Sequence, residues 1–556
     1  MKKYNTLFVV TITILLFVLL TWILPITYLS GELIDGERTQ VGIMNLFSYP
    51  IFTFYNFIYV FIYLLGIGGL YGLLNKTGAY RLILDRVTNH VKERKLLALI
   101  VTVLLFAIVV SFTGFTFEAL IVLPFIAGVV LLLGYDKITA MMVTVGSVSV
   151  GIIGTTFSKL VAGTFNEMLS TKYSDLIWVK VALLVVLSVI LIVNIIFYTK
   201  NADKEKNVEE SFLVPDKVKE KSVKVWPLVV ILITFLLILV LGTVDWSGAF
   251  GITFFDTLLE NIFKGCVLSK YVVLAVSLFV VLYNVLRSVY LKKKGNKLIN
   301  KVLHKDDKLM TKKRLVVTIV FGVFAFLALL KLLLEDVFNV SDFLSKALEL
   351  IKVNGLIEAF TWEKLLGSVQ SFGNWTYNDY LALLIALLLV IKFTYHISFT
   401  DAIENTGDGF KKVLYGAIVV VLSYTILIII SSHPIVLTIL KPMLNLTDGL
   451  SILWYPIATL VSALCNTDFT YYKYGALTLS YATTFFTDST VYPLCGLITQ
   501  SMYGFALLLA PTSSVLLFSL SILDVKYTTW LKKVWKLLLE FLLVIFITYI
   551  IVLQLI

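Results

Sequence analysis

Polar and acidic side chains interrupt otherwise apolar stretches of this 556-residue sequence in four places. The first group covers residues 111–118 and ends in Glu118. An acid inside an apolar stretch is costly unless it is paired or hydrated, so Glu118 is a candidate ligand for a substrate or an ion. The alternative is an acid in a shallow loop.

The second group is rich in glycine and hydroxyl side chains and covers residues 146–158. Its small residues could simply allow two helices to pack closely. The dense hydroxyls of Thr155, Thr156 and Ser158 instead favour an unwound segment. We therefore take these three side chains as candidate binding residues.

The third group consists of Asn466, Thr467 and Asp468, between apolar segments near residues 451–467 and 475–497. If these two segments form a hairpin, the polar group stands at its tip. These three residues are candidate binding residues as well.

The fourth group follows Pro511 in the middle of an apolar stretch and consists of Thr512, Ser513 and Ser514. Proline removes a backbone donor and breaks a helix, which frees carbonyl groups to meet a cation or a substrate ammonium. Adjacent hydroxyls can then coordinate the same ligand. This group is the sharpest candidate of the four, with helix packing as its alternative.

The composition decides the class of protein to which these groups belong. Hydrophobic residues make up 59% of the chain and charged residues 15%, with a mean hydropathy of +0.95. A soluble domain has roughly 45–50% apolar and about 25% charged residues. The sequence therefore predicts an all-α polytopic membrane protein and excludes soluble enzymes and proteins that bind nucleic acid.

About 13–15 apolar segments approach the roughly 20 residues that a helix needs to cross a bilayer, the first near residues 7–29. The net charge of +11 comes from basic residues in short loops, most clearly in residues 75–95 and 292–314. The positive-inside rule puts such loops in the cytoplasm. We expect a multi-pass protein of the cell membrane with a cytoplasmic amino terminus.

Two parts of the chain show the same order of apolar segments and predict two repeats, residues 1–198 and 379–556. A charged cytoplasmic linker, 199–224, and a central insert with three spans and an acidic outer segment, 225–378, separate them. An odd number of spans inverts whatever follows. Inverted-topology repeats with broken helices are typical of secondary transporters.

The sequence resembles the YfcC-type carriers of the ion transporter superfamily, which include proteins described as C4-dicarboxylate anaerobic carriers or as arginine/ornithine antiporter-like. The resemblance rests on several short strings in a characteristic order, at residues 21–25, 42–47, 66–78, 118–124, 133–139 and 511–513. It covers about residues 7–198 and 379–540.

The resemblance implies two re-entrant hairpins whose tips meet two broken helices near the midplane. It also implies a scaffold and a transport domain, often in a homodimer. By position, Glu118 belongs to the first hairpin and residues 466–470 to the second. Residues 155–158 and 512–514 belong to the broken helices.

Together these observations predict a secondary active transporter of a small polar metabolite in a lipid bilayer, an ion-coupled symporter or an exchanger. The acids Glu118, Asp468 and Asp488 outnumber the deep basic residues, of which Lys159 is the best case. This excess favours an amino acid such as arginine or ornithine. The alternative substrate is a C4-dicarboxylate or another organic anion, and a membrane-embedded enzyme or assembly factor is the alternative of another class.

One of the acids could equally bind Na⁺ or H⁺ as the coupling ion. We expect no catalytic residues, no metal site and no cofactor. The three cysteines and four histidines have no metal-ligand spacing.

Overall fold

The computed structural model describes fifteen stretches of the chain, of which the longest are 40–201, 370–433 and 488–556; the others are 5–24, 26–29, 32–35, 213–215, 223–255, 257–258, 270–293, 312–332, 364–365, 435, 438 and 449–465. The chain forms two compact units. Met1–Phe255 and Phe372–Ile556 form the main unit, and Asp256–Ser371 forms the second. The division falls inside the predicted central insert.

The described residues include eight helical segments long and apolar enough to cross a membrane. They are Asn5–Ile23, Ile58–Thr77, Ala79–Thr113, Ile177–Lys200, Trp226–Thr243, Tyr377–Thr394, Phe399–Ser432 and Tyr527–Leu555. Shorter apolar helices accompany them. The predicted all-α polytopic membrane protein is confirmed.

The first part of the main unit consists of helices in the following order: α1 (Asn5–Ile23), α2 (Ile43–Asn56), α3 (Ile58–Thr77), α4 (Ala79–Val91), η1 (Lys92–Arg94), α5 (Lys95–Thr113), α6 (Ala119–Leu132), α7 (Lys137–Met141), η2 (Met142–Gly146), α8 (Ser147–Ile153), η3 (Lys159–Gly163), α9 (Thr164–Leu169) and α10 (Ile177–Asn201). A small antiparallel hairpin of β1 (Ile26–Leu29) and β2 (Glu32–Asp35) lies between α1 and α2.

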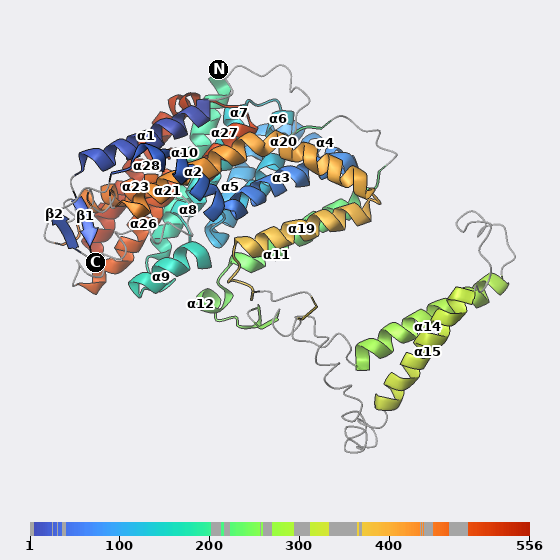
Figure 1. Cartoon of the computed structure of the whole chain (residues 1–556). Coiled ribbons are helices and arrows are strands. Elements are labelled where there is room, and N and C mark those ends of the chain that lie inside the picture. The colour runs from blue at the N-terminus through green and yellow to red at the C-terminus, as the bar shows by residue number, and fades with distance from the viewer. Residues whose placement is uncertain are drawn as a thin grey trace. The chain divides into compact units, whose positions relative to one another are not determined.

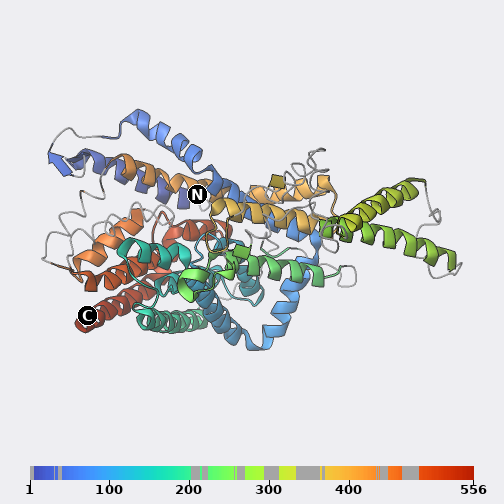
Figure 2. The same cartoon turned by 90° about the horizontal axis from the view of Figure 1, so that it is seen from below.

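The rest of the main unit contains α11 (Trp226–Thr243), α12 (Trp246–Phe250), α19 (Tyr377–Thr394), α20 (Phe399–Ser423), α21 (Thr425–Ser432), α23 (Trp454–Cys465), η7 (Ser489–Val491), α26 (Tyr492–Ala506), α27 (Ser514–Ile522) and α28 (Tyr527–Leu555). In the second unit, α14 (Lys270–Lys293) and α15 (Lys312–Leu332) pack side by side (Figures 1 and 2). There the Asn284 amide donates a hydrogen bond of 3.1 Å to Thr318 Oγ1.

Two predicted spans differ from the observed helices in an informative way. The predicted first span, residues 7–29, is too long, because α1 ends at Ile23, two residues before Pro25. The residue before a proline is disfavoured in helical geometry, so helices end there. The predicted span 138–162 is a helix that stops at Ile153 and resumes at Lys159, so it is interrupted at the hydroxyl-rich group for which the sequence favours an unwound segment.

Helices α3 and α20, far apart in the sequence, cross at glycine residues (Figure 1). A Cβ atom on Gly68 would lie 2.7 Å from the carbonyl oxygen of Gly409, and one on Gly72 would lie 3.1 Å from the Gly409 Cα. Only glycine lets two backbones approach so closely. The glycines at residues 66–72 therefore serve helix packing and join the two parts of the main unit.

The crossing yields a test with a matched control on the same helix. Gly409→Ala places a methyl group against the backbone of α3, which cannot give way as a flexible side chain would. We expect a loss of about 1–3 kcal/mol in the free energy of unfolding. Gly407→Ala is the control, because a Cβ at Gly407 meets nothing within 4 Å. Thermal unfolding of the purified proteins in detergent measures both, and equal melting temperatures would contradict a tight crossing.

Candidate functional site

The first helix break, residues 154–158, is joined to the carboxyl end of α5. The Ser111 hydroxyl donates a hydrogen bond of 2.6 Å to the Gly154 carbonyl. In return the Ser111 carbonyl accepts from the Thr155 hydroxyl and from the Thr156 amide, both at 2.9 Å. The structure thus brings the predicted group at 111–118 together with Thr155 and Thr156 through Ser111, and these three side chains are buried.

A glycine lets the chain turn at this junction. Gly114 ends α5 with a φ of 71°, a left-handed conformation that favours glycine. A Cβ there would lie 2.8 Å from the Ser158 Cβ. Ser158 itself begins the helix that follows the break, since its Oγ accepts a hydrogen bond of 3.1 Å from the Val161 amide. The turn after α5 and the break therefore fit together with no room for a larger residue.

A glutamine from the second half of the chain donates further hydrogen bonds to the carbonyls at this break. Gln500 lies on α26, is 1% exposed, and its Nε2 donates to the carbonyls of Ile153 at 2.9 Å and Thr155 at 3.0 Å. Ser149 makes a reciprocal contact, because its hydroxyl donates to the Gly504 carbonyl at 2.7 Å. Sequence reasoning missed Gln500, since a neutral amide in a helical segment carries no signal of its own.

At the second break, residues 507–513, side chains also donate hydrogen bonds to the freed backbone carbonyls. The Ser513 hydroxyl donates to the Leu507 carbonyl at 3.0 Å, and the Trp530 indole of α28 donates to the Leu508 carbonyl at 2.8 Å. The Tyr527 hydroxyl donates to the Leu509 carbonyl. Carbonyl groups that the break frees, and that were expected to meet a cation, therefore accept hydrogen bonds from side chains of the protein.

The hydroxyls after Pro511 are buried, and one of them reaches the second predicted hairpin. Thr512 Oγ1 donates a hydrogen bond of 2.8 Å to the carbonyl of Leu464, one residue before the end of α23. Ser514 is 3% exposed. Asn466, Thr467 and Asp468, the candidates at the tip of this hairpin, lie outside the described residues.

Asp488, one of the three acids counted from the sequence, has a different role. It is exposed, and its Oδ1 accepts hydrogen bonds from the Thr490 amide at 2.9 Å and the Thr490 hydroxyl at 2.7 Å. These bonds hold the pKa of the Asp488 carboxyl below its usual value. Asp488 caps η7 and therefore contributes no buried charge to a binding site.

A cavity of about 270 Å³ lies beside the first break. Among the predicted site residues, Glu118 lines it; the full lining is Glu118, Lys159, Leu160, Thr164, Glu167, Thr243, Gly373, Asn374, Trp375, Thr376, Tyr377 and Tyr380. Elements from distant parts of the chain therefore meet here, since α19 and the residues just before it contribute aromatic rings.

Glu118 is buried in this wall. It is 2% exposed, and its Oε2 lies 3.3 Å from the Thr116 amide, which donates to it. The ring of Phe117 stacks on that of Tyr63, with centroids 4.8 Å apart. Glu118 is therefore a buried acid at the end of the turn between α5 and α6.

Lys159 is the basic residue among those that line the described cavity. Its Nζ lies 3.1 Å from Glu167 Oε1 and 3.6 Å from Asp245 Oδ2. Asp245 is in turn held by the Tyr173 hydroxyl at 2.7 Å. The side chain of Lys159 is 35% exposed, so it is anchored by acids and still reaches the cavity.

The family comparison fits a carrier of this kind. The model of the family DcuC, the C4-dicarboxylate anaerobic carriers, matches residues 5–468. The chain belongs to this family. No curated protein and no solved structure matches it.

Family membership makes the protein a multi-pass membrane transporter rather than an enzyme, with a small molecule as its substrate. The match includes the first break, the cavity and Glu118. It ends before α26, so Gln500 and the break at 507–513 lie beyond it.

The role of Gln500 can be measured through stability. Gln500→Leu keeps a side chain of similar size but leaves two buried carbonyls without this donor. We expect a loss of about 1–3 kcal/mol, the cost of unsatisfied buried polar groups. The exposed Gln554→Leu at the end of α28 is the matched control. Thermal unfolding in detergent compares them, and an unchanged melting temperature for Gln500→Leu would mean that other donors satisfy the break.

Proposed function

We propose that the protein is a secondary active transporter that carries C4-dicarboxylates, the alternative substrate named above, across the membrane. The description of the matched family supports this substrate better than arginine or ornithine. Within the site, the proposal rests on the position of Lys159. Its ammonium group reaches a cavity beside a broken helix. A substrate carboxylate could share this group with Glu167 or replace Glu167 as its partner.

The charges of the cavity also bear on energy coupling. Glu118 and Glu167 line it together with a single described cation, Lys159. Two like charges about 4 Å apart repel by roughly 4 kcal/mol at an effective dielectric constant near 20. A dianion entering this cavity therefore calls for a cation that enters with it. We propose that this cation is H⁺, carried on the buried Glu118, with Na⁺ as the alternative.

The predicted orientation and assembly belong to the same proposal. The basic residues of 75–95 support a cytoplasmic amino terminus through the positive-inside rule. The resemblance to carriers that are often dimeric supports a homodimer. The predicted division into inverted repeats supports alternating access, because two similar halves allow two states of similar energy.

Counterflow in proteoliposomes tests the substrate. Vesicles loaded with unlabelled succinate should accumulate labelled succinate, whereas those loaded with arginine or ornithine should not accumulate the matching label. Lys159→Met should raise the KM for succinate at least tenfold, because a charge-assisted hydrogen bond is worth about 1.5–3 kcal/mol.

Lys532→Met, on an exposed position of α28, is the control for that measurement. It should leave the KM unchanged. Accumulation of arginine or ornithine, without accumulation of succinate, would overturn the dicarboxylate assignment. Normal succinate affinity in a folded Lys159→Met protein would remove this lysine from the binding site.

The proposed coupling role of Glu118 can be tested by comparing net uptake with exchange in a Glu118→Gln variant. In Glu118→Gln we expect succinate counterflow to persist, because exchange needs no net proton movement. Uptake driven by an imposed pH gradient should fall to the level of protein-free vesicles. Glu404→Gln, an exposed acid on α20, is the control. Uptake by Glu118→Gln that still follows the pH gradient contradicts proton coupling through this residue, and uptake that follows a sodium gradient supports Na⁺ instead.

A further inference from the structure

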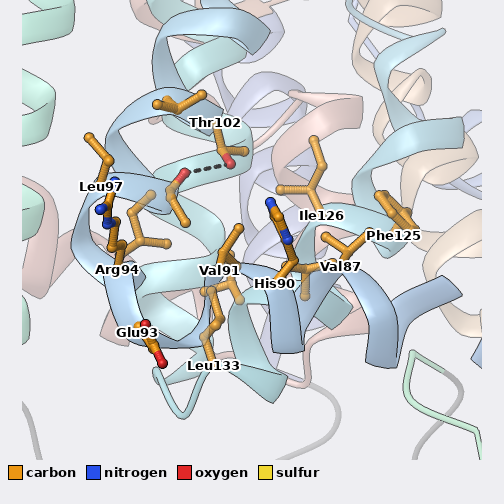
Figure 3. A pocket seen from close by; sticks show the side chains of 15 residues that line it. Val87, His90, Val91, Glu93, Arg94, Leu97, Thr102, Phe125, Ile126 and Leu133 are labelled. Atoms are coloured by element: carbon orange, nitrogen blue, oxygen red, sulfur yellow. Dashed lines mark hydrogen bonds between the residues drawn. The ribbon is translucent and has the colours of Figure 1, made fainter. Parts of the chain in front are cut away.

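A larger cavity, of about 570 Å³, lies away from the proposed transport site, where α4 turns through η1 into α5. Its walls come from α4, α5 and α6 (Figure 3). It shares no lining residue with the cavity at Glu118. The transport mechanism therefore leaves this space without a role.

The body of the cavity is apolar and faces the surroundings of the helices. Leu97 and Val101 of α5 line it while being 49% and 43% exposed. Phe125, Ile126 and Val129 of α6 form the facing wall. Exposed apolar side chains on a helix long enough to span a bilayer are in contact with lipid hydrocarbon. The groove is thus accessible to acyl chains from the side.

Charged side chains gather at one end of this groove, where Arg94 and Glu93 line it together with the imidazole of His90. His90 and Arg94 line it on either side of Val91, while the Glu93 carboxylate points away from Thr102 and Ile126 (Figure 3). Residues 86–95 contain four lysine or arginine residues and one acid. At the same end, the Lys95 ammonium donates to the Leu133 carbonyl at 2.7 Å and so ties α5 to the end of α6.

We propose that this groove is a binding site for an anionic phospholipid. The acyl chains lie along the apolar walls of α5 and α6, and the phosphate lies at Arg94 and His90. A soluble metabolite would leave the apolar walls unused, and a neutral lipid would leave the excess positive charge of residues 86–95 unmatched. Anionic headgroups are attracted by basic residues next to a membrane-spanning helix.

The lipid would contact both α4 and the hairpin made by α5 and α6. Lys95 already links the two helices of this hairpin at its base, and Ser111 and Gly114 link its other end to the first break. A molecule held in this groove therefore stabilises the arrangement of α4 against the element that carries Glu118.

Native mass spectrometry of the purified full-length protein tests the proposal with two lipids of identical acyl chains, phosphatidylglycerol and phosphatidylcholine. We expect selective retention of phosphatidylglycerol. Arg94→Gln should lower its apparent affinity about fivefold, since one basic residue near the surface contributes about 1 kcal/mol. Lys92→Gln removes the same charge from the same turn but does not line the groove, and its affinity should stay within twofold.

A second variant tests the apolar part without changing charge. Ala98→Phe fills the groove between α5 and α6 and should reduce retention of phosphatidylglycerol as strongly as Arg94→Gln. Equal retention of the two lipids, an equal loss in Lys92→Gln, or full retention in Ala98→Phe would each overturn the proposal. A dimer that Ala98→Phe dissociates, with no lipid retained, would assign the groove to a second copy of the chain and overturn it as well.

Discussion

The need to satisfy backbone groups at two helix breaks governs the rest of this structure. Away from water, an unpaired carbonyl or amide costs several kcal/mol, so irregular backbone survives only where the protein or a cavity supplies partners. At residues 154–158 these partners are Ser111 and Gln500, which come from the first and second halves of the chain. The breaks therefore need the whole main unit to be assembled.

This requirement places the hairpin of α5 and α6 where the substrate site is proposed. The bonds between Ser111 and residues 154–156 hold the end of α5 against the break, and Gly114 lets the chain turn there. Glu118 follows four residues later, so it is carried to the wall of the cavity by the same junction. One set of hydrogen bonds thus supports the broken helix and positions the buried acid.

The sequence was sufficient to predict what depends on local composition. Apolar runs predicted the helices, and hydroxyl-rich groups with glycine or proline predicted both breaks, near Thr155 and near Pro511. It was insufficient wherever a role depends on a distant partner. Gln500 and the pairing of Lys159 with Asp245 join residues that lie far apart along the chain, and no periodicity or spacing reveals them.

The count of acids behind the preference for an amino acid did not take into account where each acid lies in the structure. The count treated Glu118, Asp468 and Asp488 as equals, but Asp488 is an exposed cap and Asp468 lies outside the described residues. Glu118, buried in the cavity wall, is the one of the three that the described cavity contains.

A buried acid constrains a carrier in a different way from an acid that binds a cationic substrate. Its charge has little water around it, so its interaction with whatever else occupies the cavity is weakly screened. Lys159 is already shared between Glu167 and Asp245, so its positive charge is largely compensated before a substrate arrives. In the proposed mechanism, an entering dianion and a cation bound at Glu118 would then attract each other across the cavity. By reciprocity each ligand strengthens the other by the same factor, which is the condition for coupling their transport.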